Sequence, residues 1–157
     1  MNDAELTEVF RKYGDMLFRL AYSCTGDMSV CDDIVQEALL RYYRCGKLFD
    51  GEEGRKAWLI RVTVNLCRNH TKHWWNKRRV QLTGIEGAPG GGDSDELADL
   101  QCAILRLRPI YREVIYLHYY EGYTAEQIGK LLHISTGTVT SRLMRGRAML
   151  KGFLEEE

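Results

Sequence analysis

The sequence predicts an all-α protein, made of two small helical bundles joined by a flexible linker. Apolar residues recur every three or four positions, the period of an amphipathic helix, and strand-like alternation is scarce. Only two prolines, Pro89 and Pro109, occur in 157 residues. Residues 85–94 read IEGAPGGGDS, and their three consecutive glycines are typical of a linker. We therefore expect an N-terminal domain over 1–80, a linker rich in glycine and acids over 81–95, and a C-terminal domain over 96–157.

Three helices are expected before the linker. The first is predicted by apolar residues at helical spacing: Phe10, Tyr13, Leu17, Leu20 and Ala21. Gly26 can end this helix, and Asp27 or Ser29 can cap the next one. The second helix is expected to run to about Cys45 and to stop at Gly46. The third is expected from about residue 53 towards residue 74.

Four helices are expected after the linker. Residues 96–107 have a helical pattern, and Pro109 suits the first turn of a helix that runs to about residue 121. Thr124 and Gln127 have the spacing of a capping box, which begins a short helix. Gly129 in that helix allows a second helix to approach closely. A three-residue turn, 133–135, then leads into the last helix.

The last helix has two distinct faces. Ser135 can cap it, and His133 in the turn can need a left-handed backbone conformation. One side is apolar and is expected to be buried: Val139, Leu143, Gly146 and Leu150. The opposite side is basic and rich in hydroxyl groups, without a carboxylate: Thr138, Ser141, Arg142 and Arg145. Arg147 projects beside the core and is a weaker candidate for a base contact.

A helix, a short turn and a helix with a basic outer face form a helix-turn-helix. Its second helix fits a major groove about 12 Å wide, where Arg can read guanine. We predict duplex DNA contacts by Ser135, Thr136, Thr138, Ser141, Arg142 and Arg145. The alternative is a helical hairpin with a solvated charged face, although such faces usually mix both signs.

The formal net charge is zero, with 22 basic and 22 acidic residues, but the charges are segregated. Residues 55–79 contain eight bases and no acid, 81–100 contain five acids and no base, and 127–154 contain five bases and no acid. Because local patches attract nucleic acid and totals do not, the zero sum leaves DNA binding open.

Two further surfaces are predicted in the N-terminal half. The second helix turns a polar stripe outwards, which without further context is usually a solvated face: Asp32, Asp33, Gln36, Glu37 and Leu40. The third helix turns Leu59, Val62, Thr63 and Leu66 towards the core, and its other side is basic. We predict single-stranded nucleic acid binding there, with cations on phosphates and aromatic rings on unpaired bases, by Trp58, Arg61, Asn65, Arg68, Lys72, Trp74, Trp75, Lys77, Arg78 and Arg79. The alternative is a buried Trp58 and a solvated basic helix.

The five cysteines include no C-x-x-C pair and are odd in number, which favours reduced thiols in the cytoplasm. A metal site at Cys67, His70 and His73 is not favoured, because no fourth ligand is near. We expect no metal and no cofactor. We also expect no membrane insertion, since neither a membrane-spanning stretch nor a signal-peptide pattern is visible. Enzymatic activity is not expected, because no nucleophile–base pair, P-loop or carboxylate pair stands out.

Three segments, in this order, resemble extracytoplasmic-function (ECF) sigma factors, compact members of the sigma-70 family of bacterial RNA polymerase initiation factors. Residues 21–40, AYSCTGDMSVCDDIVQEALL, resemble the family pattern AxxxxGDxxxAEDxxQExF. Residues 58–69, WLIRVTVNLCRN, resemble WLxxIaxNlaxD. Residues 107–150 resemble the family's C-terminal segment with its EIAxxLgisxGTVkSR core. The chain departs from the usual residues at Cys31, Asp32, Asn69, Lys72, Gly129 and His133.

The resemblance implies a role for each surface. The stripe of Asp32, Asp33, Gln36, Glu37 and Leu40 would dock on the β′ clamp helices of core RNA polymerase. The third helix and the segment through Arg79 would melt and read the −10 element, and a base flipped from the non-template strand would sit against that segment. The helix-turn-helix would read the −35 element, and the helix of Val114, Ile115 and Leu117 would lie near the β flap. The linker would thread towards the RNA exit channel.

The resemblance also implies an anti-sigma factor as a regulatory partner. A transcriptional regulator that uses the helix-turn-helix without polymerase is the alternative function.

Overall fold

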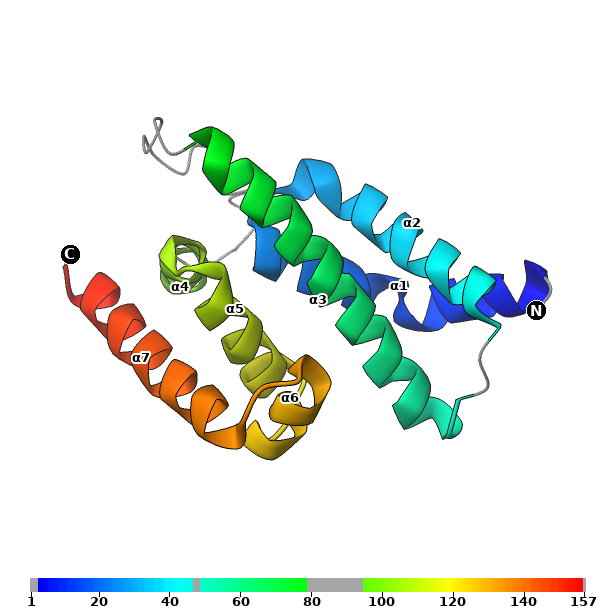
Figure 1. Cartoon of the computed structure of the whole chain (residues 1–157). Coiled ribbons are helices and arrows are strands. Elements are labelled where there is room, and N and C mark those ends of the chain that lie inside the picture. Colours follow the sequence, from blue (N-terminus) through cyan, green and yellow to red (C-terminus); the bar gives the residue numbers. More distant parts are fainter. Residues whose placement is uncertain (1–2, 47–48, 79–94, 157) are drawn as a thin grey trace. The chain divides into compact units, whose positions relative to one another are not determined.

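The computed structural model describes residues 3–46, 49–78 and 95–156, with side chains described outside 71–98. All regular secondary structure within these ranges is helical, so the predicted all-α class is confirmed (Figure 1). The chain divides into two compact units, Met1–Lys72 and His73–Glu157. The linker and the boundary expected at residue 80 lie in or beside 79–94, outside the described residues, and stay predictions. Among the helices described, none has the length and apolar character needed to cross a membrane.

The first unit consists of α1 (Asp3–Thr25), α2 (Met28–Cys45) and most of α3 (Gly51–Arg78). Helices α1 and α2 form a hairpin whose turn contains Gly26, with φ of 70° (Figure 1). The Asp27 side chain accepts a hydrogen bond from the Ser29 backbone N–H at 2.9 Å and caps α2. Gly46 ends α2 in the left-handed conformation. Both predicted stop signals and the predicted cap are therefore confirmed.

The core of this unit is built from one face of each helix. Tyr13, Leu17, Leu20 and Ala21 of α1 are buried as expected, whereas Phe10 is 54% exposed. Near the start of α3, the Glu52 carboxylate accepts hydrogen bonds from the Tyr13 hydroxyl and from Lys12 at 3.0 Å. These bonds tie α3 to α1 and hold the pKa of Glu52 below its usual value.

Helix α3 is rotated from the orientation that we predict from its sequence. Leu59 and Thr63 are buried as expected, but Val62 and Leu66 are only half-buried. The core instead takes residues from the next strip around the helix: Ile60, Val64 and Cys67. Apolar residues surround much of α3, so its own pattern does not select a face. Packing against two helices does: Cys67 Sγ lies 4.0 Å from the Ala21 carbonyl oxygen of α1, and Trp58 contacts Tyr42 of α2.

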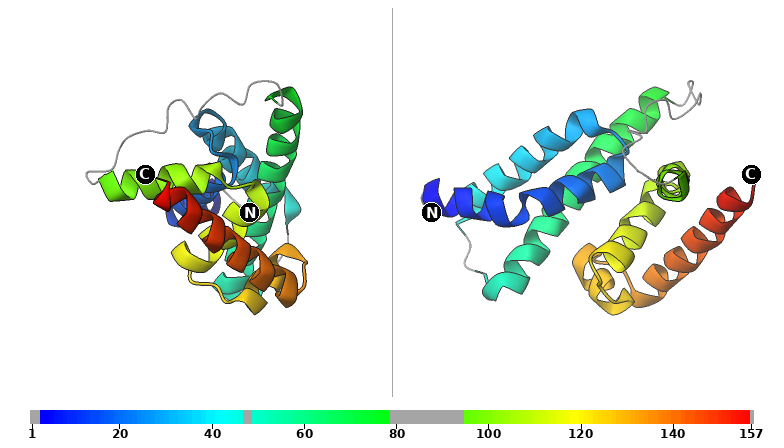
Figure 2. Two further views of the ribbon diagram at one scale, coloured as in Figure 1. Left: turned by 90° about the vertical axis from the view of Figure 1, so that its left-hand side faces the viewer. Right: turned by 180° about the vertical axis from the view of Figure 1, so that it is seen from behind.

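The second unit contains α4 (Asp95–Arg106), α5 (Pro109–Ile115), a π-helical turn η1 (Tyr116–Tyr120), α6 (Ala125–Leu132) and α7 (Thr136–Glu155). The helix predicted from Pro109 to about residue 121 is present, but its second half is π-helical. Helix α5 lies alongside α7, and α4 packs near the carboxyl end of α7 (Figure 2). There the Arg106 guanidinium lies 4.0 Å from the Phe153 ring centre and 3.3 Å from a Glu156 oxygen.

Candidate nucleic-acid interface

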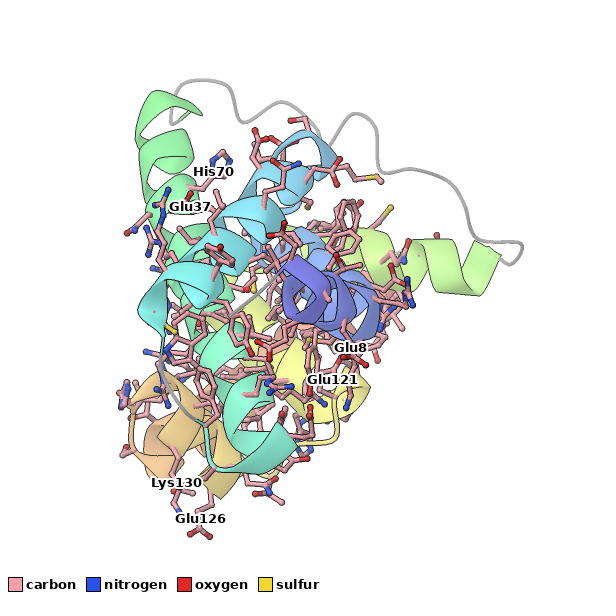
Figure 3. The ribbon with its side chains drawn as sticks, turned by 90° about the vertical axis from the view of Figure 1, so that its right-hand side faces the viewer. Glu8, Glu37, His70, Glu121, Glu126 and Lys130 are labelled. Atoms are coloured by element: carbon pink, nitrogen blue, oxygen red, sulfur yellow. The ribbon has the colours of Figure 1, made fainter. Side chains whose placement is uncertain are left out.

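Helix α6 begins at a complete capping box. The Gln127 backbone N–H donates to Thr124 Oγ1 at 3.1 Å, and the Thr124 N–H donates to Gln127 Oε1 at 2.9 Å. These two bonds satisfy amides at the start of the helix that have no partner within it. Glu126 and Lys130 pair at 3.6 Å on the outer surface of α6 (Figure 3). The predicted start of the helix-turn-helix is therefore confirmed.

The turn between α6 and α7 is as tight as the sequence predicts. His133 has φ of 57° and ψ of 44°, the left-handed conformation expected for it. The Ile134 N–H donates to the Gly129 carbonyl oxygen at 3.0 Å, which folds the turn back on α6. Ser135 then caps α7, since the Thr138 N–H donates to Ser135 Oγ at 3.1 Å. The Ser135 and Thr138 hydroxyls also lie 2.8 Å apart, so both groups take part in the cap.

The two faces of α7 are arranged largely as predicted. Val139, Leu143 and Gly146 are buried, and Leu150 is half-buried. Four candidate DNA contacts lie on the opposite side: Ser141 and Arg145 are exposed, and Thr138 and Arg142 are half-exposed. Ser135 and Thr136 are also exposed and stand at the start of the helix. No acidic side chain interrupts this face between residues 127 and 154. A helix of this kind can present two arginines and several hydroxyl groups to a DNA groove.

Two contacts that support α7 are absent from our sequence prediction. A Cβ atom on Gly146 would lie 3.0 Å from Ile115 Cδ1, so the glycine allows α5 to pack closely on α7. The Arg147 guanidinium donates a hydrogen bond of 2.9 Å to the Tyr119 hydroxyl of η1. The two residues of this bond are 28 positions apart, and no local sequence pattern signals the contact.

The polar stripe of α2 faces outwards. Asp32, Asp33 and Gln36 are exposed, and Leu40 is 43% exposed. Glu37 is half-buried and forms an ion pair with Arg41, with 3.1 Å between Oε1 and Nε (Figure 3 labels Glu37). Tyr43, which our sequence analysis does not single out, is 41% exposed. Its spacing of three and seven residues from Leu40 and Gln36 is the signal that could have placed it on this surface.

The basic side of α3 is described only in its first half. Asn65 is exposed, and Arg61 and Arg68 are half-exposed. Trp58 is half-buried, with its ring edge-on to Tyr42 at 6.0 Å and to Phe49 at 5.7 Å. The structure does not describe the side chains of the other predicted residues of this surface. Only the backbone is described for Lys72, Trp74, Trp75, Lys77 and Arg78, and Arg79 lies outside the described residues.

The cysteines and histidines of α3 do not gather as metal ligands in the part of the chain that is described. Cys67 is buried, His70 Nε2 is buried without a hydrogen-bond partner, and the side chain of His73 lies outside the described residues. Cys31 is also buried, and burial raises the pKa of its thiol to about 11. A neutral thiol of this kind is a poor metal ligand and a poor nucleophile.

Two family models match the chain, each within one half of it. The model described as Sigma-70 region 2 matches residues 9–76, which include all of α2 and most of α3. The model described as Sigma-70, region 4 matches residues 97–150, which include the helix-turn-helix. The α2 stripe, the α3 residues up to Trp75 and the candidate contacts of the helix-turn-helix therefore fall inside matched segments, whereas Lys77, Arg78 and Arg79 lie beyond them.

Curated relatives match most of the chain. ECF RNA polymerase sigma factor SigW of Bacillus subtilis is 30% identical, over 92% of this chain and 86% of the relative. SigL of Mycobacterium tuberculosis is 30% identical, over 98% and 90%. SigE of Mycolicibacterium smegmatis is also 30% identical over 94% of this chain, which spans only 60% of that relative's length.

Two solved structures share the fold. The sigma factor RpoE of Bartonella quintana, crystallised with the anti-sigma factor NepR, has a TM-score of 0.79 at 22% identity, covering 96% of this chain and 97% of that one. CnrH, solved in complex with the cytosolic domain of CnrY, has a TM-score of 0.73 at 24% identity, covering 99% and 91%. At these identities the likeness concerns the fold.

Proposed function

The chain belongs to the extracytoplasmic-function (ECF) RNA polymerase sigma factors, and we propose which of its surfaces perform the steps of promoter-specific transcription initiation. Proteins of this family are initiation factors that act with core RNA polymerase and promoter DNA, rather than catalysts. The alternative of a helix-turn-helix regulator without polymerase is not favoured, because the region 2 match covers the half that such a regulator would not need. We place its action in the cytoplasm, where bacterial RNA polymerase and the chromosome are found.

The N-terminal half, expected to end near residue 80, would hold core polymerase and the −10 element. Asp32, Asp33, Gln36 and Leu40 of α2 are exposed side by side, and with Glu37 they would dock on the β′ clamp helices. An exposed leucine among carboxylates is typical of a partner surface, where apolar contact and charge act together.

The −10 contacts would come from α3 and the segment after it. Asn65 is an exposed amide that can pair with a base edge, and Arg61 and Arg68 flank it on the same side. The ring of Trp58 is held by Tyr42 and Phe49, so only its outer part is open to a base. The tandem Trp74 and Trp75 would supply further stacking.

The second unit would read the −35 element as duplex and complete the polymerase contact. The observation that supports this best is the carboxylate-free face of α7, with Arg142 and Arg145 beside the capped helix start. Val114, Ile115 and Leu117 are at most 2% exposed, so a β-flap contact by that part of the chain would use other side chains. The linker over 81–95 would pass towards the RNA exit channel. An anti-sigma partner is part of the proposal, as with the NepR and CnrY complexes of the two structural neighbours.

Run-off transcription with core polymerase tests this proposal. We expect initiation from a restricted promoter set, and an Arg145→Ala variant should lower it about tenfold, since a bidentate contact to guanine contributes about 1–3 kcal/mol. Lys130→Ala is the matched control, because Lys130 is an exposed base on α6. Equal effects of the two variants, or no transcription from any promoter of a genome-wide set with folded protein, would contradict the proposal. Binding of core polymerase that survives Asp33→Lys with Glu37→Lys would favour the alternative function.

A further inference from the structure

The first unit contains a cavity of about 480 Å³ to which all three of its helices contribute. Glu8 and Lys12 line it from α1, Tyr42 from α2, and Glu52 and Arg55 from the start of α3. Sites for small molecules usually have volumes of roughly 300–1,000 Å³, so the cavity is large enough for a ligand. None of the residues that we assign to DNA or to polymerase lines it.

One end of the cavity has an excess of positive charge. The Glu52 carboxylate lies 3.0 Å from Lys12 Nζ and 3.0 Å from Arg55 Nη1, so a single acid serves two bases. The Arg55 guanidinium also lies 6.0 Å from the centre of the Tyr42 ring. Its Nε atom is buried and has no hydrogen-bond partner among the described groups. Because a buried donor without a partner is unfavourable, this end is suited to an anion that accepts a hydrogen bond from Arg55.

The other end of the cavity is acidic. Glu8 is exposed and forms no ion pair with any side chain in the described part of the chain (Figure 3 labels Glu8). It precedes Lys12 by four residues, which is a rise of about 6 Å along α1. Glu5, a further three residues towards the N-terminus, lines the cavity as well. The acidic and basic ends are therefore separated by about one helical turn.

The cavity also has an apolar part, which consists of Val9 and the rings of Tyr42 and Phe49. The centres of the two rings are 5.6 Å apart, and their planes differ by 11°. Phe49 is only half-buried, so part of its ring is open to a ligand. A few charged groups beside an apolar wall are typical of a site that binds and orients a small molecule.

We propose that this cavity binds a free α-amino acid with an apolar side chain. Its carboxylate would accept hydrogen bonds from Arg55 and Lys12, and its ammonium group would pair with Glu8. Its side chain would lie against Phe49 and Val9. The two charged groups of an amino acid are joined through a single carbon atom, and a charge-assisted hydrogen bond of about 2.7–2.9 Å at each end would span the distance between Glu8 and the basic end.

Other classes of ligand use the cavity less completely. A simple carboxylate would leave Glu8 without a cation, and an amine or the N-terminus of a peptide would leave Arg55 Nε without an acceptor. A metal ion fits poorly, because Lys12 and Arg55 already engage the Glu52 carboxylate. The described residues also contain no group of three side chains placed to hold a metal.

Isothermal titration calorimetry of the full chain with matched probes tests the proposal. The first probe is L-leucine, for which we expect saturable binding. L-leucinamide lacks the carboxylate, isocaproate lacks the ammonium group, and glycine lacks the apolar side chain. Each of these three should bind at least about tenfold more weakly than L-leucine, because each loses one of the three contacts.

Two substitutions test the two ends of the cavity separately. Glu8→Gln should weaken binding of L-leucine about tenfold but that of isocaproate less than about twofold. Arg55→Lys keeps the charge and removes the Nε–H, so it should weaken binding of L-leucine about tenfold but that of L-leucinamide less than about twofold. The matched controls, Glu126→Gln and Arg41→Lys, make the same changes outside the cavity and should leave binding unchanged. Circular dichroism melting shows whether each variant is folded, and the exposed position of Glu8 keeps one test independent of the α3 contacts.

Four outcomes would overturn the proposal. The first is the absence of saturable binding of L-leucine. The second is equal binding of L-leucinamide or isocaproate, which would make the cavity a site for amines, for chain N-termini or for simple carboxylates. The third is binding of glycine as tight as that of L-leucine, which would exclude the apolar contact. The fourth is an equal loss in a variant and its matched control, which would place the ligand elsewhere on the chain.

Discussion

A Cβ atom placed on Gly129 would lie 2.7 Å from the carbonyl oxygen of Ile134. The absence of a side chain at this position therefore lets the turn of the helix-turn-helix fold directly onto α6. The Gly129 carbonyl also accepts the Ile134 N–H at 3.0 Å, so both groups of one residue shape the turn. An alanine at this position would not fit without a shift of the backbone.

We expect Gly129→Ala to lower the free energy of unfolding by about 2 kcal/mol, because overlap with a backbone atom outweighs the better helix propensity of alanine. Denaturant unfolding followed by circular dichroism measures the change. Gly152→Ala is the control, since no atom lies within 4 Å of the added Cβ. That variant should be unchanged or more stable by up to about 1 kcal/mol. Equal stability of the two variants would show that the turn adapts without strain.

The backbone of His133 provides a second test of the same turn. Its φ of 57° lies in the left-handed region, where a side chain costs about 1 kcal/mol and glycine is free of that strain. We expect His133→Gly to raise the free energy of unfolding by about 1 kcal/mol, reduced in part by the greater entropy of glycine in the unfolded chain. His133→Ala keeps the strain and should not be stabilising. A less stable His133→Gly protein would mean that the imidazole makes a contact of its own.

Helix ends were predictable from the sequence because each depends on a few adjacent residues. Thr124 with Gln127, Ser135 and Asp27 supply side-chain oxygen atoms to nearby backbone amides, and Gly46 supplies a left-handed turn. The outward faces of α2 and α7 were predictable for a related reason. Each of these helices has one continuous apolar side that is buried, so most of the opposite side faces solvent or a partner.

Other features depend on contacts between distant residues and have no local signature. Helix α3 is apolar around much of its circumference, and the choice of Ile60 and Val64 over Val62 for the core comes from packing on α1 and α2. The π-helical turn places Tyr119 against Arg147 of α7, across 28 positions of sequence. Phe10 fits the apolar period of α1 but is exposed, since a helical pattern cannot show where the neighbouring helices end.

Thr63 offers a test of whether a buried polar group in the core of α3 has a hydrogen-bond partner. This residue has no exposed surface, and its Oγ1 has no hydrogen-bond partner. A buried hydroxyl without a partner is unfavourable, so Thr63→Val should raise the free energy of unfolding by about 1 kcal/mol. Thr63→Ser keeps the hydroxyl and removes a methyl group, and it should be destabilising by about 1 kcal/mol. If valine proves destabilising and serine neutral, the hydroxyl must be bonded in solution.

The buried thiol of Cys31 should be protected from chemical reagents. It should also make the free energy of unfolding depend on pH in the alkaline range. Burial raises its pKa from 9.0 to about 11, and its Sγ lies 3.2 Å from the Asp27 carbonyl oxygen. Above pH 9 the unfolded chain loses this proton while the folded chain keeps it, so ionisation favours unfolding. The free energy of unfolding should therefore fall between about pH 9 and pH 11, and less steeply in Cys31→Ala.

Alkylation by iodoacetamide at pH 8, mapped by mass spectrometry, checks the same thiol directly. The exposed Cys45 and Cys102 should react first, and Cys31 should react only after unfolding by denaturant. Native labelling of Cys31 at the rate of Cys45 would mean that this part of the core opens readily.

The two central carboxylates of the α2 stripe should contribute unequally to polymerase binding. The Glu37 carboxylate is already paired with Arg41 at 3.1 Å, whereas Asp33 is exposed and has no ion pair with the side chains that the structure describes. A partner's cation would have to displace Arg41 to reach Glu37, which reduces the net gain. We expect Asp33→Asn to weaken binding of core polymerase by about fivefold and Glu37→Gln by about twofold, measured by biolayer interferometry.

Asp15→Asn, the same change at an exposed position of α1, is the control and should have no effect. Arg41→Ala frees the Glu37 carboxylate and should leave binding unchanged or tighter, so weaker binding by this variant would mean that Arg41 itself contacts the polymerase.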